Sequence, residues 1–194
     1  MPMNDLPNDA AVSGTVAIVG RPNVGKSALF NRIIGRRMAI VHDEPGVTRD
    51  RLAGEARWAG RTFRLFDTGG LGLIDRARAT DEIATAIQQQ VTAAIEDADV
   101  IVMVTDVQTG CTPLDEDVGR RLRECGRPVA IAANKADHSQ LELAAAEFDR
   151  FGWPVFAVSA EHGRGLDELL DWIVSRWPPR AQEAADDGGG PPPT

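Results

Sequence analysis

The sequence predicts an α/β domain in which a mostly parallel sheet of six strands carries helices on both faces and one antiparallel strand at its edge. Short apolar runs alternate with stretches of helical periodicity, which is the pattern of parallel strands joined by crossover helices. Residues 99–106, 128–134 and 154–160 are almost continuously apolar, as expected of strands buried on both faces. In sheets of this kind, ligands bind at the carboxyl ends of the strands.

The individual elements follow from local patterns along the chain. Residues 15–19 (TVAIV) form the first strand, which leads into a glycine-rich loop and a helix that begins near Lys26. The runs EARWAG (55–60) and RTFRLF (61–66) predict a hairpin that turns at Gly60 and supplies the antiparallel edge. Apolar residues spaced four apart predict a helix over 83–95, and a second apolar face predicts the last helix over 166–177.

Length and composition predict one well-buried domain, which we place at residues 14–177 of the 194-residue chain. We expect 1–13 to be a disordered N-terminal segment, and 178–194, rich in Gly, Pro and acidic residues, to be a disordered tail or an interdomain linker. No apolar run approaches the roughly 18 residues of a membrane span, so we expect a cytoplasmic protein with no membrane partner. The net charge of −8 argues against direct RNA binding by this domain.

The segment GRPNVGKS (Gly20–Ser27) has the G-x-x-x-x-G-K-[ST] spacing of a P-loop NTPase and lies between a predicted strand and a predicted helix. Its glycines let backbone N–H groups point at phosphate oxygens, and the helix N-terminus adds the positive end of its dipole. Lys26 is one of only two lysines, and a compact ammonium enters between β- and γ-phosphates where a guanidinium is too broad. We expect Ser27 to bind Mg²⁺. The expected phosphate-loop contacts come from Asn23, Val24, Gly25, Lys26, Ser27 and Ala28.

The second lysine, Lys135, lies in NKAD (134–137) directly after an apolar strand. Asp137 can accept hydrogen bonds from guanine N1–H and the 2-amino group, whereas adenine offers neither donor and would leave the carboxylate unpaired. We expect Asn134 to brace this turn and the stem of Lys135 to lie along the base. The sequence therefore predicts GTP or GDP as the nucleotide.

Three further segments complete the predicted site. DTGG (67–70) ends a strand, which places Asp67 near Mg²⁺ and the Gly70 N–H near the γ-phosphate. Thr48, in EPGVTRD (44–50), is the candidate second Mg²⁺ ligand. SAEHG (159–163) follows the last strand, where the Ala160 N–H can reach guanine O6. From this segment we expect nucleotide contacts by Ser159, Ala160 and Glu161.

These motifs, in this order, resemble the translation-factor-related GTPases. The segments VGRPNVGKSALFNRI, PGVTRDR, DTGG, ANKAD and SAEHGRGLDELL together are similar to the first GTPase domain of the Der (EngA) family of bacterial ribosome-assembly GTPases. The resemblance covers roughly Gly14 to Trp177. It implies a Ras-like GTPase domain, Mg²⁺-dependent hydrolysis of GTP to GDP and phosphate, and a role in assembly of the large ribosomal subunit.

The resemblance also raises the question of what else the parent protein contains. Members of the Der family carry a second GTPase domain and a KH-like domain, and this chain contains one P-loop motif. We interpret the chain as a fragment of a longer protein, with a natural single-domain relative as the alternative.

The predicted catalytic residues are Lys26, Asn23, Thr48 and Gly70. Leu71, which follows Gly70, cannot orient an attacking water as the Gln of Ras-like enzymes does. The resemblance implies a hydrophobic residue at this position and a K⁺ ion coordinated by Asn23, with a turn-forming Asn that stabilises the loop as the alternative. The rival function is a module gated by GTP and GDP that hydrolyses little.

Overall fold

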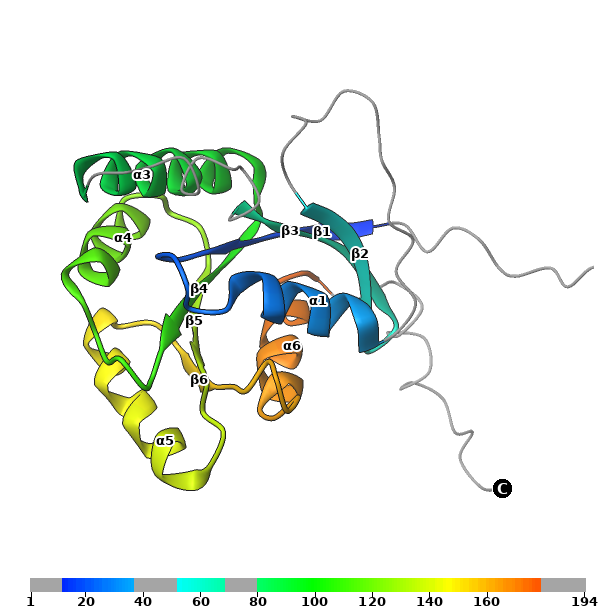
Figure 1. The fold of residues 1–194 in the computed structure, drawn as a ribbon. Helices are drawn as coiled ribbons and strands as arrows, with labels where there is room; N and C mark the ends of the chain where they lie inside the picture. The colour runs from blue at the N-terminus through cyan, green and yellow to red at the C-terminus, as the bar shows by residue number, and fades with distance from the viewer. Residues whose placement is uncertain (1–11, 37–51, 69–79, 179–194) are drawn as a thin grey trace, which may run out of the picture.

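In a computed structural model, the described residues are 12–36, 52–68 and 80–178, and their six strands form one sheet with the order β2-β3-β1-β4-β5-β6 (Figure 1). Strands β1, β3, β4, β5 and β6 run parallel, and β2 pairs antiparallel with β3 at one edge. The predicted fold class is therefore confirmed. In chain order the elements are β1 (Val12–Val19), α1 (Lys26–Arg36), β2 (Leu52–Trp58), β3 (Arg61–Asp67), α3 (Thr80–Asp97), β4 (Val100–Asp106), α4 (Pro113–Arg123), β5 (Val129–Asn134), α5 (Ser139–Ala144), the 3₁₀ helix η2 (Ala145–Phe151), β6 (Val155–Ala157) and α6 (Leu166–Val174).

The central strands of the sheet are buried on both faces, most completely in β4 and β5, which explains their uninterrupted apolar sequences. In β1, Val16 and Ile18 join the core on the side of α1 and α6, whereas Ala17 and Val19 join the core on the side of α3, α4 and η2. Figure 1 shows these two groups of helices on opposite sides of the sheet. Because successive side chains of a strand point to opposite faces, a strand between two helical layers needs apolar residues at every position.

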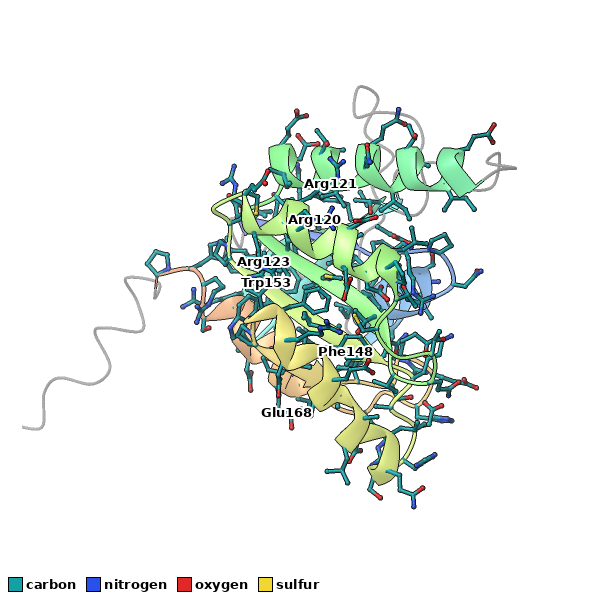
Figure 2. The ribbon with its side chains drawn as sticks, turned by 90° about the vertical axis from the view of Figure 1, so that its left-hand side faces the viewer. Arg120, Arg121, Arg123, Phe148, Trp153 and Glu168 are labelled. Carbon is teal, nitrogen blue, oxygen red and sulfur yellow. The ribbon has the colours of Figure 1, made fainter. Side chains whose placement is uncertain are left out.

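The face carrying α4 and η2 separates an apolar interior from an arginine-rich exterior. Phe148 of η2 is fully buried, while Arg120, Arg121 and Arg123 are exposed on the last turn of α4 (Figure 2). Gly119 lies on the inner side of α4, where an added Cβ would come within 2.5 Å of the Phe151 ring. The glycine therefore lets η2 pack closely against α4.

The hairpin lies where the sequence predicts it, between Trp58 and Arg61, with Ala59 and Gly60 both at positive φ. Such a two-residue turn matches the twist of the strands that it joins. Two boundaries differ from prediction. β1 begins at Val12, inside the segment 1–13 expected to be disordered, because Val12 pairs with β3. β6 ends at Ala157, because the chain then turns and Ser159 bridges to Arg164.

Residues 1–11 and 179–194 lie outside the described part of the chain. They make up most of the two terminal segments that the sequence predicts to be disordered. Trp177 packs against the fold close to the end of the described residues. The Trp177 ring lies against Phe63, with 5.9 Å between ring centroids, and an added Cβ at Gly14 would come within 2.3 Å of the indole. Within residues 12–36, 52–68 and 80–178, no helix is both long and apolar enough to cross a membrane.

Candidate nucleotide-binding site

The predicted motifs meet at the carboxyl edge of the sheet. The phosphate loop follows β1, Asp67 ends β3, Asp106 ends β4 and Asn134 ends β5. These ends are aligned by strand register, since Ile18 pairs with Asp67 and Asp106 pairs with Asn134. Segments more than 100 residues apart in the chain therefore form one site.

The phosphate loop depends on glycine at its first and sixth positions. Gly20 has φ 149° and Gly25 has φ 95°, both in the region that side chains disfavour. An added Cβ at Gly20 would lie 2.4 Å from the carbonyl oxygen of Val104, and one at Gly25 would lie 2.3 Å from Nδ2 of Asn134. The loop opens directly into α1, whose first turn contains no acidic residue, so the positive helix end is free to face an anion.

Lys26 is buried at the start of α1, with 6% of its surface exposed. Its Nζ donates a hydrogen bond to the carbonyl oxygen of Arg21 at 2.8 Å. Burial lowers the pKa of Lys26 from 10.5 to about 8, with Asp67 opposing the shift and Arg21 adding to it. A phosphate group in this loop would supply the negative charge that stabilises the ammonium.

Ser27 and Asp67 lie side by side next to the phosphate loop. The Ser27 hydroxyl donates to Oδ2 of Asp67 at 2.7 Å, and Asp67 is fully buried. A hydroxyl and a carboxylate are hard oxygen donors of the kind that Mg²⁺ prefers, together with substrate phosphates. The described residues contain no group of three or more His, Cys, Asp or Glu side chains that could hold a metal without such a substrate. The donor set therefore fits a magnesium ion shared with a nucleotide.

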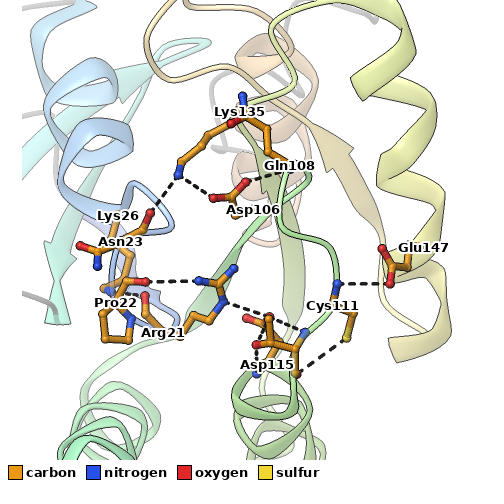
Figure 3. Close-up of polar contacts among 11 residues, drawn as sticks. Arg21, Pro22, Asn23, Lys26, Asp106, Gln108, Cys111, Asp115, Lys135 and Glu147 are labelled. Atoms are coloured by element: carbon orange, nitrogen blue, oxygen red, sulfur yellow. Dashed lines mark hydrogen bonds and ion pairs between the residues drawn. The ribbon is translucent and has the colours of Figure 1, made fainter.

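Asn134 and Lys135 join the predicted base-reading turn, residues 134–137, to the phosphate loop. Asn134 donates from Nδ2 to the carbonyl oxygen of Val24 at 2.9 Å, so it ties this turn to the phosphate loop. Lys135 has φ 66°, and its Nζ donates to the carbonyl oxygen of Asn23 at 3.0 Å and to Oδ2 of Asp106 at 2.5 Å (Figure 3). The lysine stem therefore spans the distance from the end of β5 to the phosphate loop.

Asp137 is held in place by side chains from two other loops. Its Oδ1 accepts a hydrogen bond from the Ser159 hydroxyl at 2.6 Å, and its Oδ2 accepts one from Nε2 of Gln108 at 3.4 Å. Ala160 N donates to Oδ1 of Asn134 at 3.0 Å, a partner that the sequence did not indicate. A guanine O6 would share this N–H with Asn134.

The structure adds residues that motif reading did not identify. Arg32 of α1 donates to the carbonyl oxygens of Ala160 and Glu161, the latter through a short contact. Arg21 pairs with buried Asp115 of α4, with 3.1 Å between Nε and Oδ2 (Figure 3). Asp106, which contacts Lys135, is a further residue that the motifs do not include. The sequence could have indicated it, because it is the acidic residue that ends an apolar strand.

The other predicted site residues differ in how far the structure describes them. Asn23 is exposed in the phosphate loop and Ala28 is exposed in the first turn of α1, whereas Ser159 is buried next to Asp137. Thr48 and Gly70, together with Leu71, lie outside the described residues, so their predicted roles stay predictions.

Comparison with known proteins agrees with this geometry. The sequence matches the family described as 50S ribosome-binding GTPase over residues 15–135. It is 50% identical to GTPase Der of Myxococcus xanthus over 180 residues, which cover 91% of this chain and 38% of that protein. It is 45% identical to GTPase Der of Salinispora tropica, covering 98% of this chain and 40% of that protein. The chain thus spans about two fifths of the length of these curated relatives.

Solved structures of GTPases share the fold. An Era variant from Aquifex aeolicus bound to GDP.AlF4− superposes with a TM-score of 0.66 and 28% identity, covering 86% of this chain and 57% of that one. The G domain of the Thermotoga maritima FeoB iron transporter superposes with a TM-score of 0.56 and 29% identity, covering 84% of this chain and 97% of that one. The resemblance to Der GTPases is confirmed. Because the family match includes both the phosphate loop and the start of the base-reading turn, the chain belongs to the 50S ribosome-binding GTPase family.

Proposed function

We propose that this GTP-binding switch domain binds GTP and GDP together with Mg²⁺, hydrolyses GTP, and serves a longer protein in assembly of the large ribosomal subunit. The observation that carries the proposal is the meeting of a P-loop, with its buried Lys26, and an Asn-Lys-x-Asp turn at one edge of the sheet. A P-loop recognises phosphates, and an Asn-Lys-x-Asp turn recognises guanine.

The phosphate contacts are assigned to the loop and the first turn of α1. Backbone N–H groups of residues 23–28 bind phosphate oxygens, and Lys26 exchanges its bond to the Arg21 carbonyl for the β- and γ-phosphates. Ser27, with Thr48 and Asp67, would hold Mg²⁺. When bound, Mg²⁺ neutralises negative charge on the phosphates.

The base contacts are assigned to the two turns that follow β5 and β6. Asp137 accepts from guanine N1–H and the 2-amino group, and it is oriented for this by the Ser159 hydroxyl. The Ala160 N–H is proposed for guanine O6, with Ser159 and Glu161 completing this side of the site. Arg32 supports the same turn from α1.

Hydrolysis requires positive charge where negative charge develops in the transition state. Lys26 and the loop N–H groups supply part of it, and the proposal assigns the remainder to a K⁺ ion held by Asn23. One observation supports this assignment. The Asn23 side chain is exposed at the phosphate loop, and within the described parts of the chain its side-chain amide makes no hydrogen bond. The φ of 64° at Asn23 fits the alternative, a turn-forming Asn, because Asn tolerates this conformation better than most residues.

The ribosomal role rests on the family and on the relatives named GTPase Der. An Era structure, which is 27% identical to this chain with a TM-score of 0.66, contains MgGDPNP and a segment of 16S ribosomal RNA. By analogy with the Der resemblance, the proposed partner is the large subunit, reached through a second GTPase domain and a KH-like domain of the parent protein.

GTP turnover by this chain with Mg²⁺, in KCl and in NaCl of equal ionic strength, tests the proposal. We expect hydrolysis at least about tenfold faster in KCl, equivalent to about 1.4 kcal/mol in the barrier. Asn23→Gly should abolish the difference and retain GDP binding. Glycine is the suitable replacement because alanine would be strained at φ 64°.

Equal rates in the two salts would contradict the K⁺ assignment alone. Tight GDP binding with no turnover in either salt would instead favour a GTP- and GDP-gated binding module. Absence of guanine-nucleotide binding would contradict the whole proposal.

A further inference from the structure

Asp106 is a buried carboxylate for which the proposed chemistry has no task. It ends β4, between the phosphate loop and the base-reading turn, and is 3% exposed. Nothing in a P-loop or in an Asn-Lys-x-Asp turn requires an acid at this point of the sheet. A buried carboxylate is costly unless it is paired, so its partners indicate what it does.

The partners of Asp106 lie on the base-reading side of the site. Oδ2 is 2.5 Å from Nζ of Lys135, and Oδ1 accepts a hydrogen bond from Gln108 N at 2.9 Å (Figure 3). Burial tends to raise the pKa of Asp106, but the hydrogen bonds from Lys135 and from the Gln108 and Thr109 backbone outweigh burial and lower it. Asp106 is therefore ionised at neutral pH and presents a full negative charge to Lys135.

Lys135 is fixed at both ends by these contacts. Its backbone lies in the tight turn after β5, and its ammonium is held between Asp106 Oδ2 and the carbonyl oxygen of Asn23. Its side chain is 36% exposed, so the stem between these anchors remains available for contact. A free lysine side chain would lose rotamer entropy when ordered by a ligand.

We infer that Asp106 is a positioning residue for guanine binding, because it holds the Lys135 stem in place as a preformed platform for the base. The inference rests on the proposed guanine-nucleotide site. Asp106 touches neither base nor phosphate in this arrangement and acts through Lys135. Gln108 extends the same support to the second base-reading residue, because its Nε2 donates to Asp137.

The test compares Asp106→Asn with the wild-type chain by displacement of a fluorescent GDP analogue. Asparagine keeps the shape and can still accept from Gln108 N, but it loses the charge that holds Lys135. We expect GDP affinity to fall about tenfold, the order of the ordering entropy of one lysine. Affinity for inorganic pyrophosphate, which has no base, should change by less than about twofold.

A double-mutant cycle with Lys135→Met separates positioning from a general structural effect. Methionine keeps an apolar stem of similar length at the same positive φ and lacks the charge. In that background, Asp106→Asn should change GDP affinity by less than about twofold, because residue 135 no longer carries the ammonium that pairs with Asp106. Glu116→Gln, which removes a carboxylate from the exposed ion pair between Glu116 of α4 and Arg150 of η2, is the matched control and should leave GDP affinity unchanged.

Three results would overturn the inference while leaving the proposed function intact. GDP affinity could be unchanged in Asp106→Asn, the tenfold loss could persist in the Lys135→Met background, or pyrophosphate and GDP affinities could fall equally. The last result would mean that Asp106 acts through the phosphate loop. Failure of the wild-type chain to bind GDP would instead contradict the proposed function, on which the inference depends.

Discussion

Lys26 couples the stability of the domain to pH in an unusual direction. Its pKa is about 8 in the folded protein and 10.5 when unfolded, so between these values the unfolded chain binds more protons. Without nucleotide, the free energy of unfolding should therefore rise as the pH increases from about 8 to about 10, by up to about 1.4 kcal/mol per pH unit. Urea denaturation at several pH values measures this slope.

The background for that measurement is favourable, because the chain has one other lysine and no tyrosine. Burial raises the pKa of the Cys111 thiol, which gives a slope of opposite sign, so the experiment is best done with Cys111→Ser. Lys26→Met should remove the rise in stability. A rise that survives this replacement would mean that another group carries the linkage.

Asp137 is predicted to decide which base is bound. Asp137→Asn replaces a pair of acceptors by one acceptor and one donor, which suits the 2-carbonyl of xanthine and not the 2-amino group of guanine. The preference for GTP over XTP should change by about 10³ or more if two buried hydrogen bonds are exchanged. Competition binding measures the ratio, and continued preference for GTP would exclude Asp137 as the base-reading residue.

Helix α4 is joined to the phosphate loop by a buried ion pair. Asp115 lies in the first turn of α4, where it caps the helix together with Thr112, and its Oδ2 also pairs with Nε of Arg21. Asp115→Ala removes the side-chain half of the capping box, in which Asp115 Oδ2 accepts from Thr112 N, and leaves the Arg21 guanidinium without its charged partner. We expect a loss of about 3 kcal/mol or more in the free energy of unfolding, measured by urea denaturation.

Two further variants test the cause of that loss. Asp117 pairs with Arg120 on the exposed side of the same helix, so Asp117→Ala should cost less than about 0.5 kcal/mol. Replacing both partners, as Arg21→Met with Asp115→Leu, should cost less than Asp115→Ala alone, because no buried charge is left unpaired. Equal losses for Asp115→Ala and Asp117→Ala would show that burial of the pair is unimportant.

The elements that the sequence predicted best are those whose burial is uniform. The strands buried on both faces and the α3 and α6 helices show plain apolar patterns, and each is present. Helix α4 gives a weaker signal, because its buried positions are Asp115, Val118, Gly119 and Leu122, of which two are large and apolar. Gly119 disfavours a helix by propensity, and only its tertiary contact with Phe151 explains it.

Contiguous motifs could be predicted from the sequence, and contacts between distant motifs could not. GRPNVGKS and NKAD identify the phosphate loop and the base-reading turn because each is a local stretch with its own spacing. The Asp106–Lys135 and Arg21–Asp115 pairs join residues 29 and 94 positions apart. Strand order and register create these neighbours, and no local pattern records them.

The packing of Trp177 on Gly14 brings the two ends of the domain together. Gly14, in the first strand, and Trp177, just after the last helix, touch directly, and Arg61 ties the chain at the same place by donating to the carbonyl oxygens of Trp177 and Pro178. The polypeptide path from residue 14 to residue 177 is therefore nearly a closed circuit. A short peptide could therefore join these two positions, and new chain termini could be placed in a surface loop elsewhere. The domain is suited to circular permutation of this kind.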